Sequence, residues 1–309
     1  MKKTLMQAIS DRRRILGNQL AYVTEIDEAY ELKAAKKSSQ CPYAYEEQLE
    51  QLNRPISRFD SIDLTNSSKG PSNRGHSKNQ RQRSDLEIEA LARDVLTQIW
   101  KKRESLFPDA RTLRPIDFVD PDTALRMYGY TVQTVGALGQ HALESNRLAN
   151  VAGILDAPSR QVLLSSGFPS NVRNYTAAHE LGHVVMHEFV AVHRDKPLDA
   201  IRQGVNPQER EADKFAAYFL MPSKLVRTAF EAVFGVGPFV LNEETRFALG
   251  GSIPGHANNW HPKNLRELSS ALSVADRFNG QTFVSLVNQF RVSKTAMAIR
   301  LEELGLVAL

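Results

Sequence analysis

The chain has 309 residues, ordinary apolar and charged fractions, and a formal net charge of +4 at pH 7. This length allows one large domain or two modest ones with ample core. The single cysteine, Cys41, excludes an internal disulfide. The longest apolar run, Ala232–Leu241, is too short to span a bilayer, and Asp11 with the arginines after it interrupts any N-terminal signal segment. We therefore expect a cytoplasmic protein with no membrane partner.

The first 84 residues divide into a helical part and a basic, polar part. Leu5, Ile9 and Leu16 recur at roughly helical spacing, so we predict a helical appendage over residues 1–64, which either binds a partner or packs on its own domain. Residues 65–84 contain five Lys or Arg, no acid and otherwise polar side chains, and cannot bury enough surface to fold. We predict a basic flexible linker there. A solvated tether is favoured over contact with nucleic acid.

From Asp85 the pattern is that of a folded core, which we place at residues 85–234. An amphipathic helix is predicted over 86–101, a short helix over 122–128 and a strand over 130–135. Two strands, at 151–155 and 161–165, flank a turn and indicate a hairpin. The order of elements indicates an α+β fold with a small antiparallel sheet beside the two helices that follow it. An extended substrate could join a free edge of that sheet.

The stretch Thr176–His187 reads TAAHELGHVVMH and contains an H-E-x-x-H arrangement. Residues four apart share one face of an α-helix, so His179 and His183 can hold a single metal ion between them. Glu180 lies about 100° further around the helix, where it can reach a water at the metal without being a ligand. Two imidazole ligands and a glutamate base form the zinc-protease pattern.

The surroundings of this motif favour a helix. No proline lies between residues 170 and 196, and Ser170 or Asn171 can cap the helix. The alternative is a helix with several surface histidines. His187 extends the histidine row by four more residues, but the drift of about 40° per step carries it off the ligand position. We interpret His187 as a packed histidine beside the site.

A third ligand is expected in the segment Glu209–Pro222, which opens with charges and turns apolar. With Glu209 placed at 0° on a helix, Asp213 falls within about 40° and Glu211 roughly 200° away. We therefore predict Glu209 as the ligand and expect Glu211 to point into solvent. Asp213 is placed to accept the remaining N–H of a ligating histidine. The alternative is an acidic, solvated start of a helix.

Three blocks of this sequence resemble the ImmA/IrrE-type metallopeptidases. They read YTAAHELGHVVMH at Tyr175–His187, EREADKFAAYFLMP at Glu209–Pro222 and LVNQFRVSKTAMAIRLEELGLV at Leu286–Val307. Their order and spacing match as well. The resemblance covers roughly residues 86–234 and the last thirty or so residues. Residues 1–84 have no counterpart, and 235–271 look like an insertion.

The resemblance implies a zinc endopeptidase. It implies that His179, His183 and Glu209 bind Zn²⁺ and that Glu180 is the general base. Proteins of this kind resemble bacterial and mobile-element enzymes, several of which cut helix-turn-helix repressors and so switch on phage, conjugative-element or stress genes. Others resemble partners in toxin–antitoxin systems. The expected partner is therefore a protein substrate, a transcriptional repressor.

Two predictions concern the C-terminal part. Residues 235–271 are predicted to be an inserted loop or lid, whose His256 or His261 could steady an oxyanion. Residues 272–309 are predicted to form a helix-turn-helix-like region, with helices at 281–290 and 295–304, capped by Ser293 and Gly305. The second helix is not clearly basic, so we expect it to pack on the core or grip a protein rather than read DNA.

The sequence therefore predicts a zinc-dependent endopeptidase that regulates gene expression by cleaving a repressor. Two alternatives stay open. One is a DNA-binding regulator with a structural metal site, which the basic linker and the C-terminal helices favour. The other is a toxin–antitoxin-type component that acts by binding without proteolysis.

Overall fold

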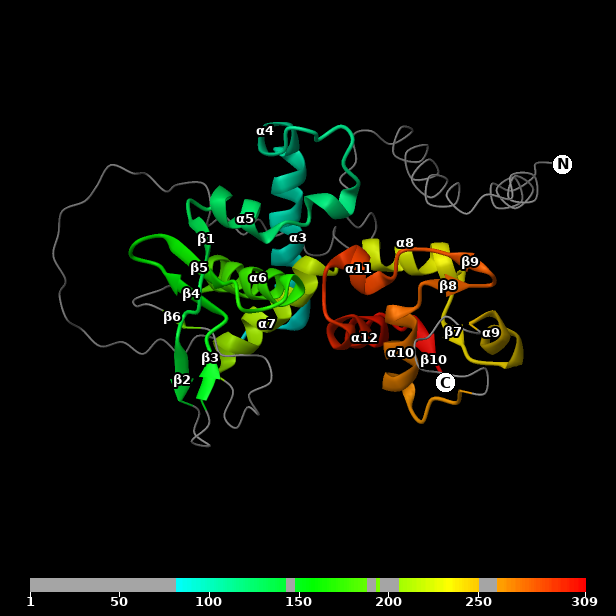
Figure 1. Ribbon diagram of the computed structural model, residues 1–309. Coiled ribbons are helices and arrows are strands. Elements are labelled where there is room, and N and C mark those ends of the chain that lie inside the picture. Colours follow the sequence, from blue (N-terminus) through cyan, green and yellow to red (C-terminus); the bar gives the residue numbers. More distant parts are fainter. Residues whose placement is uncertain (1–81, 143–147, 188–192, 195–205, 250–259) are drawn as a thin grey trace.

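The computed structural model describes residues 82–142, 148–187, 193–194, 206–249 and 260–309. The predicted appendage 1–64 and nearly all of the predicted linker lie outside these residues. The described part is elongated, with a sheet at one end, helices α3, α6 and α7 in the middle and a helical cluster with the C-terminus at the other end (Figure 1). Its α+β class is confirmed.

Helix α3 (Asp85–Lys101) opens the described core. Ser84 caps it: its hydroxyl accepts from the Glu87 N–H, and the Glu87 carboxylate accepts from the Ser84 N–H. The predicted stripe faces inward, since Ile88, Val95 and Ile99 are buried. Three short helices follow: α4 (Arg103–Leu106), the 3-10 helix η1 (Pro115–Phe118) and α5 (Pro121–Met127).

The main sheet of the described residues has the strand order β1-β5-β4-β6. The predicted hairpin is confirmed, since β4 and β5 pair antiparallel. Strand β1 pairs with β5 in parallel, so the sheet is mixed rather than wholly antiparallel. Strand β4 precedes β5 in the chain and runs opposite to it, so the hairpin turn gives β5 the direction of β1. Strand β6 covers the edge of β4 at Ile154 and Leu155. A separate pair, β2-β3, completes this end; the strands are β1 (Thr131–Val135), β2 (Gln140–Ala142), β3 (Leu148–Asn150), β4 (Gly153–Asp156), β5 (Gln161–Ser165) and β6 (His193–Arg194).

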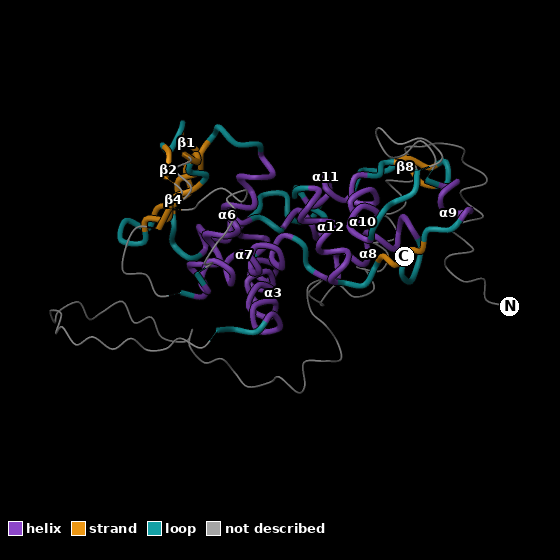
Figure 2. The backbone as a smooth tube through the Cα atoms, turned by 90° about the horizontal axis from the view of Figure 1, so that it is seen from below, coloured by secondary structure: helices purple, strands orange, loops and turns teal. Residues whose placement is uncertain are grey.

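Helices α6 (Ser170–Met186) and α7 (Pro207–Leu220) pack closely against each other, and α7 also packs on α3 (Figure 2). Gly182 permits the close approach. A Cβ there would lie 3.1 Å from the Ala212 Cα and 3.2 Å from the Phe215 Cβ. A larger residue would push the two helices apart.

The C-terminal part is helical with small strand pairs: α8 (Ser223–Phe234), β7 (Phe239–Val240), α9 (Glu243–Ala248), α10 (Leu265–Val274), β8 (Arg277–Phe278), β9 (Gln281–Thr282), α11 (Leu286–Phe290), α12 (Lys294–Glu303) and β10 (Val307–Ala308). Strands β7 and β10 pair in parallel. The helix predicted from 281 begins only at 286, because residues 281–282 pair with β8. Ser293 caps α12, and Gly305 follows it with a φ of +63°, both as predicted.

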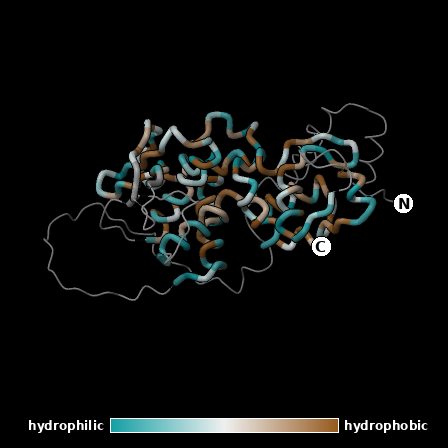
Figure 3. The backbone as a smooth tube through the Cα atoms, turned by 60° about the horizontal axis from the view of Figure 1, so that its bottom comes forward, coloured by the Kyte–Doolittle hydropathy of each residue, from teal (hydrophilic) through white to brown (hydrophobic). Residues whose placement is uncertain are grey.

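One hydrophobic core runs from α3 and the sheet through α6 and α7 to α10–α12. Brown apolar stretches alternate with teal polar ones along the described part of the chain (Figure 3). The predicted divisions at 234/235 and 271/272 stay predictions, and the described part of 235–271 carries β7, α9 and the start of α10. None of the described helices combines the length and the apolar character that a bilayer crossing requires.

Candidate metal centre

Helix α6 carries the H-E-x-x-H residues into the interior. It begins at Ser170 with Pro169 in the capping position, so neither Ser170 nor Asn171 is its N-cap. Side chains His179, Glu180 and His183 are all buried. The alternative of a helix with surface histidines is therefore wrong for His179 and His183.

Helix α7 brings a carboxylate to the two imidazoles. It begins at Pro207, one residue after its N-cap Asn206, which places Glu209 in the first turn. The His179 and His183 Nε2 atoms lie 3.0 Å apart. One Glu209 oxygen lies 3.5 Å from His179 Nε2 and the other 3.5 Å from His183 Nε2. Among the described residues, this trio is the group whose donor atoms converge as metal ligands do.

These separations fit one small cation. Two donors bound about 2.1 Å from a tetrahedral ion lie about 3.4 Å apart, close to the three observed distances. Both histidines also use their Nδ1 atoms elsewhere, with Asp213 and His187. Their Nε2 lone pairs are thus directed at a common point, which a cation would stabilise. The donor set of two imidazoles and one carboxylate is one that zinc accepts.

Asp213 lies one turn beyond Glu209 and contacts the ring of His179. Its Oδ1 is 3.0 Å from His179 Nδ1. The Tyr175 hydroxyl donates to the backbone carbonyl of Asp213 at 3.0 Å. Asp213 therefore fixes the orientation of one imidazole, at the place the helical spacing predicts for it.

The expectation that Glu211 is solvated is wrong. Its residue exposure is only 5%. Helix α7 is covered by α6 and by α3 together, so its buried arc extends through Ala212 and Phe215 rather than centring on Glu209. Glu209 lies at one border of that arc and Glu211 at the other. The helical repeat predicts which residues of α7 share a face, but it cannot predict that two other helices, α6 and α3, cover α7.

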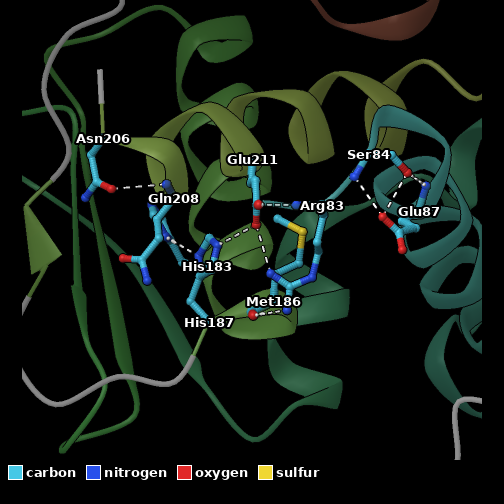
Figure 4. A network of polar contacts seen from close by, with 9 residues as sticks. All are labelled: Arg83, Ser84, Glu87, His183, Met186, His187, Asn206, Gln208 and Glu211. Atoms are coloured by element: carbon cyan, nitrogen blue, oxygen red, sulfur yellow. Dashed lines mark hydrogen bonds and ion pairs between the residues drawn. The ribbon is translucent and has the colours of Figure 1, made fainter. Parts of the chain in front are cut away.

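Glu211 belongs to a polar network that begins at Arg83 and ends at His183 (Figure 4). The Arg83 backbone N–H and guanidinium both donate to its carboxylate, at 2.7 and 2.8 Å. Burial alone would raise the pKa of Glu211, but these hydrogen bonds outweigh it and the net pKa is lowered. The carboxylate is therefore held in its ionised form.

His187 stands between Glu211 and His183. Its Nε2 lies 3.2 Å from Glu211 Oε2 and its Nδ1 lies 3.0 Å from His183 Nδ1. Burial lowers the pKa of His187, although Glu211 acts in the opposite direction. The residue is thus packed beside the site, as we interpret it from the sequence, and contacts a candidate ligand rather than joining the three converging donors.

Strand β4 passes directly over Glu180. A Cβ on Gly153 would lie 2.5 Å from the Thr176 side chain and 3.3 Å from Glu180 Oε1. Only a glycine lets the strand backbone approach α6 this closely. Glu180 itself is fully buried, between α6 and the sheet.

Some residues at the centre were not found by sequence reasoning. Because the residues before Arg83 are polar and basic, the sequence places it in the predicted linker. No local pattern links it to Glu211, 128 positions away. Gly153 could have been noticed as an isolated glycine at a strand end, which suggests a close backbone approach. Of the two candidate oxyanion residues, His256 lies outside the described residues and His261 is exposed.

Residues 139–234 match the family model described as the IrrE N-terminal-like domain, a peptidase family. The matched segment includes His179, Glu180, His183 and Glu209. No curated protein and no solved structure matches the chain. The match to an IrrE N-terminal-like domain over residues 139–234 agrees with the resemblance visible in this part of the sequence.

Proposed function

We propose that this protein is a zinc-dependent endopeptidase, with His179, His183 and Glu209 as zinc ligands and Glu180 as general base. One observation carries the proposal: two imidazoles and one carboxylate converge at 3.0–3.5 Å beside a buried glutamate. Three protein ligands leave a fourth tetrahedral position for water, as in catalytic rather than structural zinc sites. The peptidase family match supports the same conclusion.

Zinc, when bound, supplies the acidity that lets a water ionise near neutral pH and polarises the substrate carbonyl. The residues of this chain do the rest. Glu180 accepts the proton of the attacking water and passes it to the departing amine. Asp213 and His187 fix the two imidazole rings, so that their Nε2 atoms stay directed at the ion.

The proposed substrate is a protein, a helix-turn-helix transcriptional repressor, and the proposed location is the cytoplasm. The support is the resemblance of all three sequence blocks to peptidases that act on such repressors. Cleavage would relieve repression and so regulate genes of a mobile element or a stress response.

The DNA-binding alternative draws on α12 and the basic linker. In the described structure the Arg300 side chain of α12 is 4% exposed and pairs with Glu89 of α3. A guanidinium committed in this way is not available to a phosphate. This burial favours a packing role for α12 over DNA reading.

The test is to incubate the purified protein with the repressor encoded beside its gene, with and without a chelator. The proposal predicts discrete cleavage that the chelator stops and added zinc restores, and no cleavage by His183→Ala. Tight complex formation without cleavage would support the toxin–antitoxin reading instead. Salt-dependent, chelator-insensitive binding to duplex DNA would support the DNA-binding regulator.

A further inference from the structure

We propose that Arg83 is a positioning residue for the metal centre. Through Glu211 and His187 it fixes the ring of His183, so the position of the chain before α3 affects metal affinity. The inference rests on the proposed zinc site. It concerns a residue that lies outside the matched segment 139–234 and directly before Ser84, the N-cap of α3.

Arg83 is held at three points. Its backbone N–H donates to Glu211 Oε1 at 2.7 Å and its Nη1 donates to Glu211 Oε2 at 2.8 Å. Its Nη2 donates at 2.8 Å to the backbone carbonyl of Met186, the last residue of α6. One side chain therefore joins the chain before α3 to both metal-bearing helices (Figure 4).

The donors and acceptors beyond Arg83 fit one consistent order. If His183 directs its Nε2 lone pair at the metal, its Nδ1 carries the proton and donates to His187 Nδ1, 3.0 Å away. His187 then carries its proton on Nε2 and donates to Glu211 Oε2 at 3.2 Å. The Arg83 guanidinium compensates the charge of that buried carboxylate. Each group in this series therefore supplies the hydrogen-bond donor or acceptor that its neighbour needs.

His183 thus has an orienting series that parallels the contact between Asp213 and His179, but it is longer. The Asp213 side chain is 21% exposed and sits on the same helix as Glu209. The Glu211 side chain is 6% exposed, so it cannot keep its charge by hydration and depends on Arg83. Loss of the guanidinium would weaken the acceptor of His187 and release the ring of His183.

The experiment measures zinc affinity of the full chain by competition with a chromophoric chelator. The variants are Arg83→Gln, Arg83→Lys and Glu211→Gln, with Arg111→Gln as a control at an exposed arginine outside the network. Removing a group that contacts a ligand typically costs 10–100-fold in affinity, so we expect a loss of roughly 3–10-fold for Arg83→Gln, which acts two residues further away. Arg83→Lys should restore part of it, because lysine keeps the charge but not the fork.

Two further readouts separate positioning from general stabilisation. The absorption bands of the Co²⁺-loaded protein should change shape in Arg83→Gln and Glu211→Gln, since they report ligand geometry. The double variant Arg83→Gln/Glu211→Gln should bind zinc no more weakly than Glu211→Gln alone, because both act through one series. Should Arg83→Gln not fold, Arg83→Lys alone and combined with Glu211→Gln gives the same comparison.

Wild-type zinc affinity and cobalt bands in Arg83→Gln would overturn the inference, as would fully additive losses in the double variant. Both results leave the proposed function intact. A wild-type protein that binds no zinc would instead overturn the proposed function, and this inference with it.

Discussion

Two arginines, Arg83 and Arg300, make similar contacts but belong to networks that lead to different parts of the molecule. Arg83 contacts Glu211 and the carbonyl of Met186. Arg300 contacts Glu89 and Glu303, donates to the carbonyl of Met221, and lies 4.6 Å over the Tyr218 ring. Each guanidinium joins a carboxylate and a helix-end carbonyl across several helices.

The difference lies in where each network ends. The Arg83 network continues through His187 to a candidate metal ligand. The Arg300 network instead continues through Glu303 to Lys214 and Asp85, and joins α12 to α7 and α3. The Arg300 side chain is also more buried, at 4% against 32% for Arg83. We infer that Arg300 serves the stability of the whole fold, while Arg83 serves the geometry of the site.

The largest expected effect comes from removing the end point of the Arg83 network. His183→Ala deletes one of three ligands, so zinc affinity should fall by more than the roughly 100-fold upper range for residues that only contact a ligand. Zinc content of the purified protein, measured by elemental analysis, checks this. Zinc at the wild-type level in His183→Ala would show that the ligand set is different.

Arg300→Met should lower the free energy of unfolding and leave zinc affinity unchanged. Breaking a fully buried ion pair costs roughly 3–5 kcal/mol; because Glu89 and Glu303 remain partly exposed, we expect about 2–3 kcal/mol here. Urea unfolding of the zinc-free protein measures the loss. A drop in zinc affinity comparable to that of Arg83→Gln would remove the distinction between the two networks.

Gly182→Ala tests the packing of α6 against α7, the two helices that carry the candidate ligands. The added methyl meets backbone atoms of Ala212 at 3.1–3.2 Å, so α6 and α7 must separate slightly. We expect a net loss of about 1 kcal/mol in unfolding free energy, since the overpacking exceeds the gain in helix propensity, and weaker zinc binding because Glu209 moves with α7. Gly136→Ala is the control, since a Cβ there meets nothing within 4 Å.

The smallest effect is expected from the exposed pair of Arg266 and Glu302. Hydrogen bonds from Arg266 lower the pKa of Glu302 below its ordinary 4.5. A lowered folded-state pKa means that the pair stabilises the fold above pH 4.5 and that this contribution is lost as the pH falls through the folded-state value. Glu302→Gln should therefore cost about 0.5 kcal/mol at pH 7, as for other exposed pairs, and less at pH 3. An equal cost at both pH values would assign the effect to packing.

The same contrast shows what the sequence could predict. The H-E-x-x-H spacing and the Glu209–Asp213 spacing lie within single helices, where the 3.6-residue repeat determines geometry, and the structure brings these residues together. The hairpin followed from local turn chemistry. Arg83 and Arg300 could not be predicted, because their partners lie 128 and 211 positions away. Glu211 was misplaced for the same reason, since its burial depends on α3.

The central claim, that the protein cleaves peptide bonds, is tested most directly at Glu180. Glu180→Gln keeps the size of the side chain but cannot accept the proton of the attacking water. It should bind zinc with wild-type affinity and lose at least ~10²-fold in repressor cleavage, the range for general-base catalysis. Glu104→Gln, at an exposed position, should cleave like the wild type. Undiminished cleavage by Glu180→Gln, or full derepression in cells that carry it, would contradict the account.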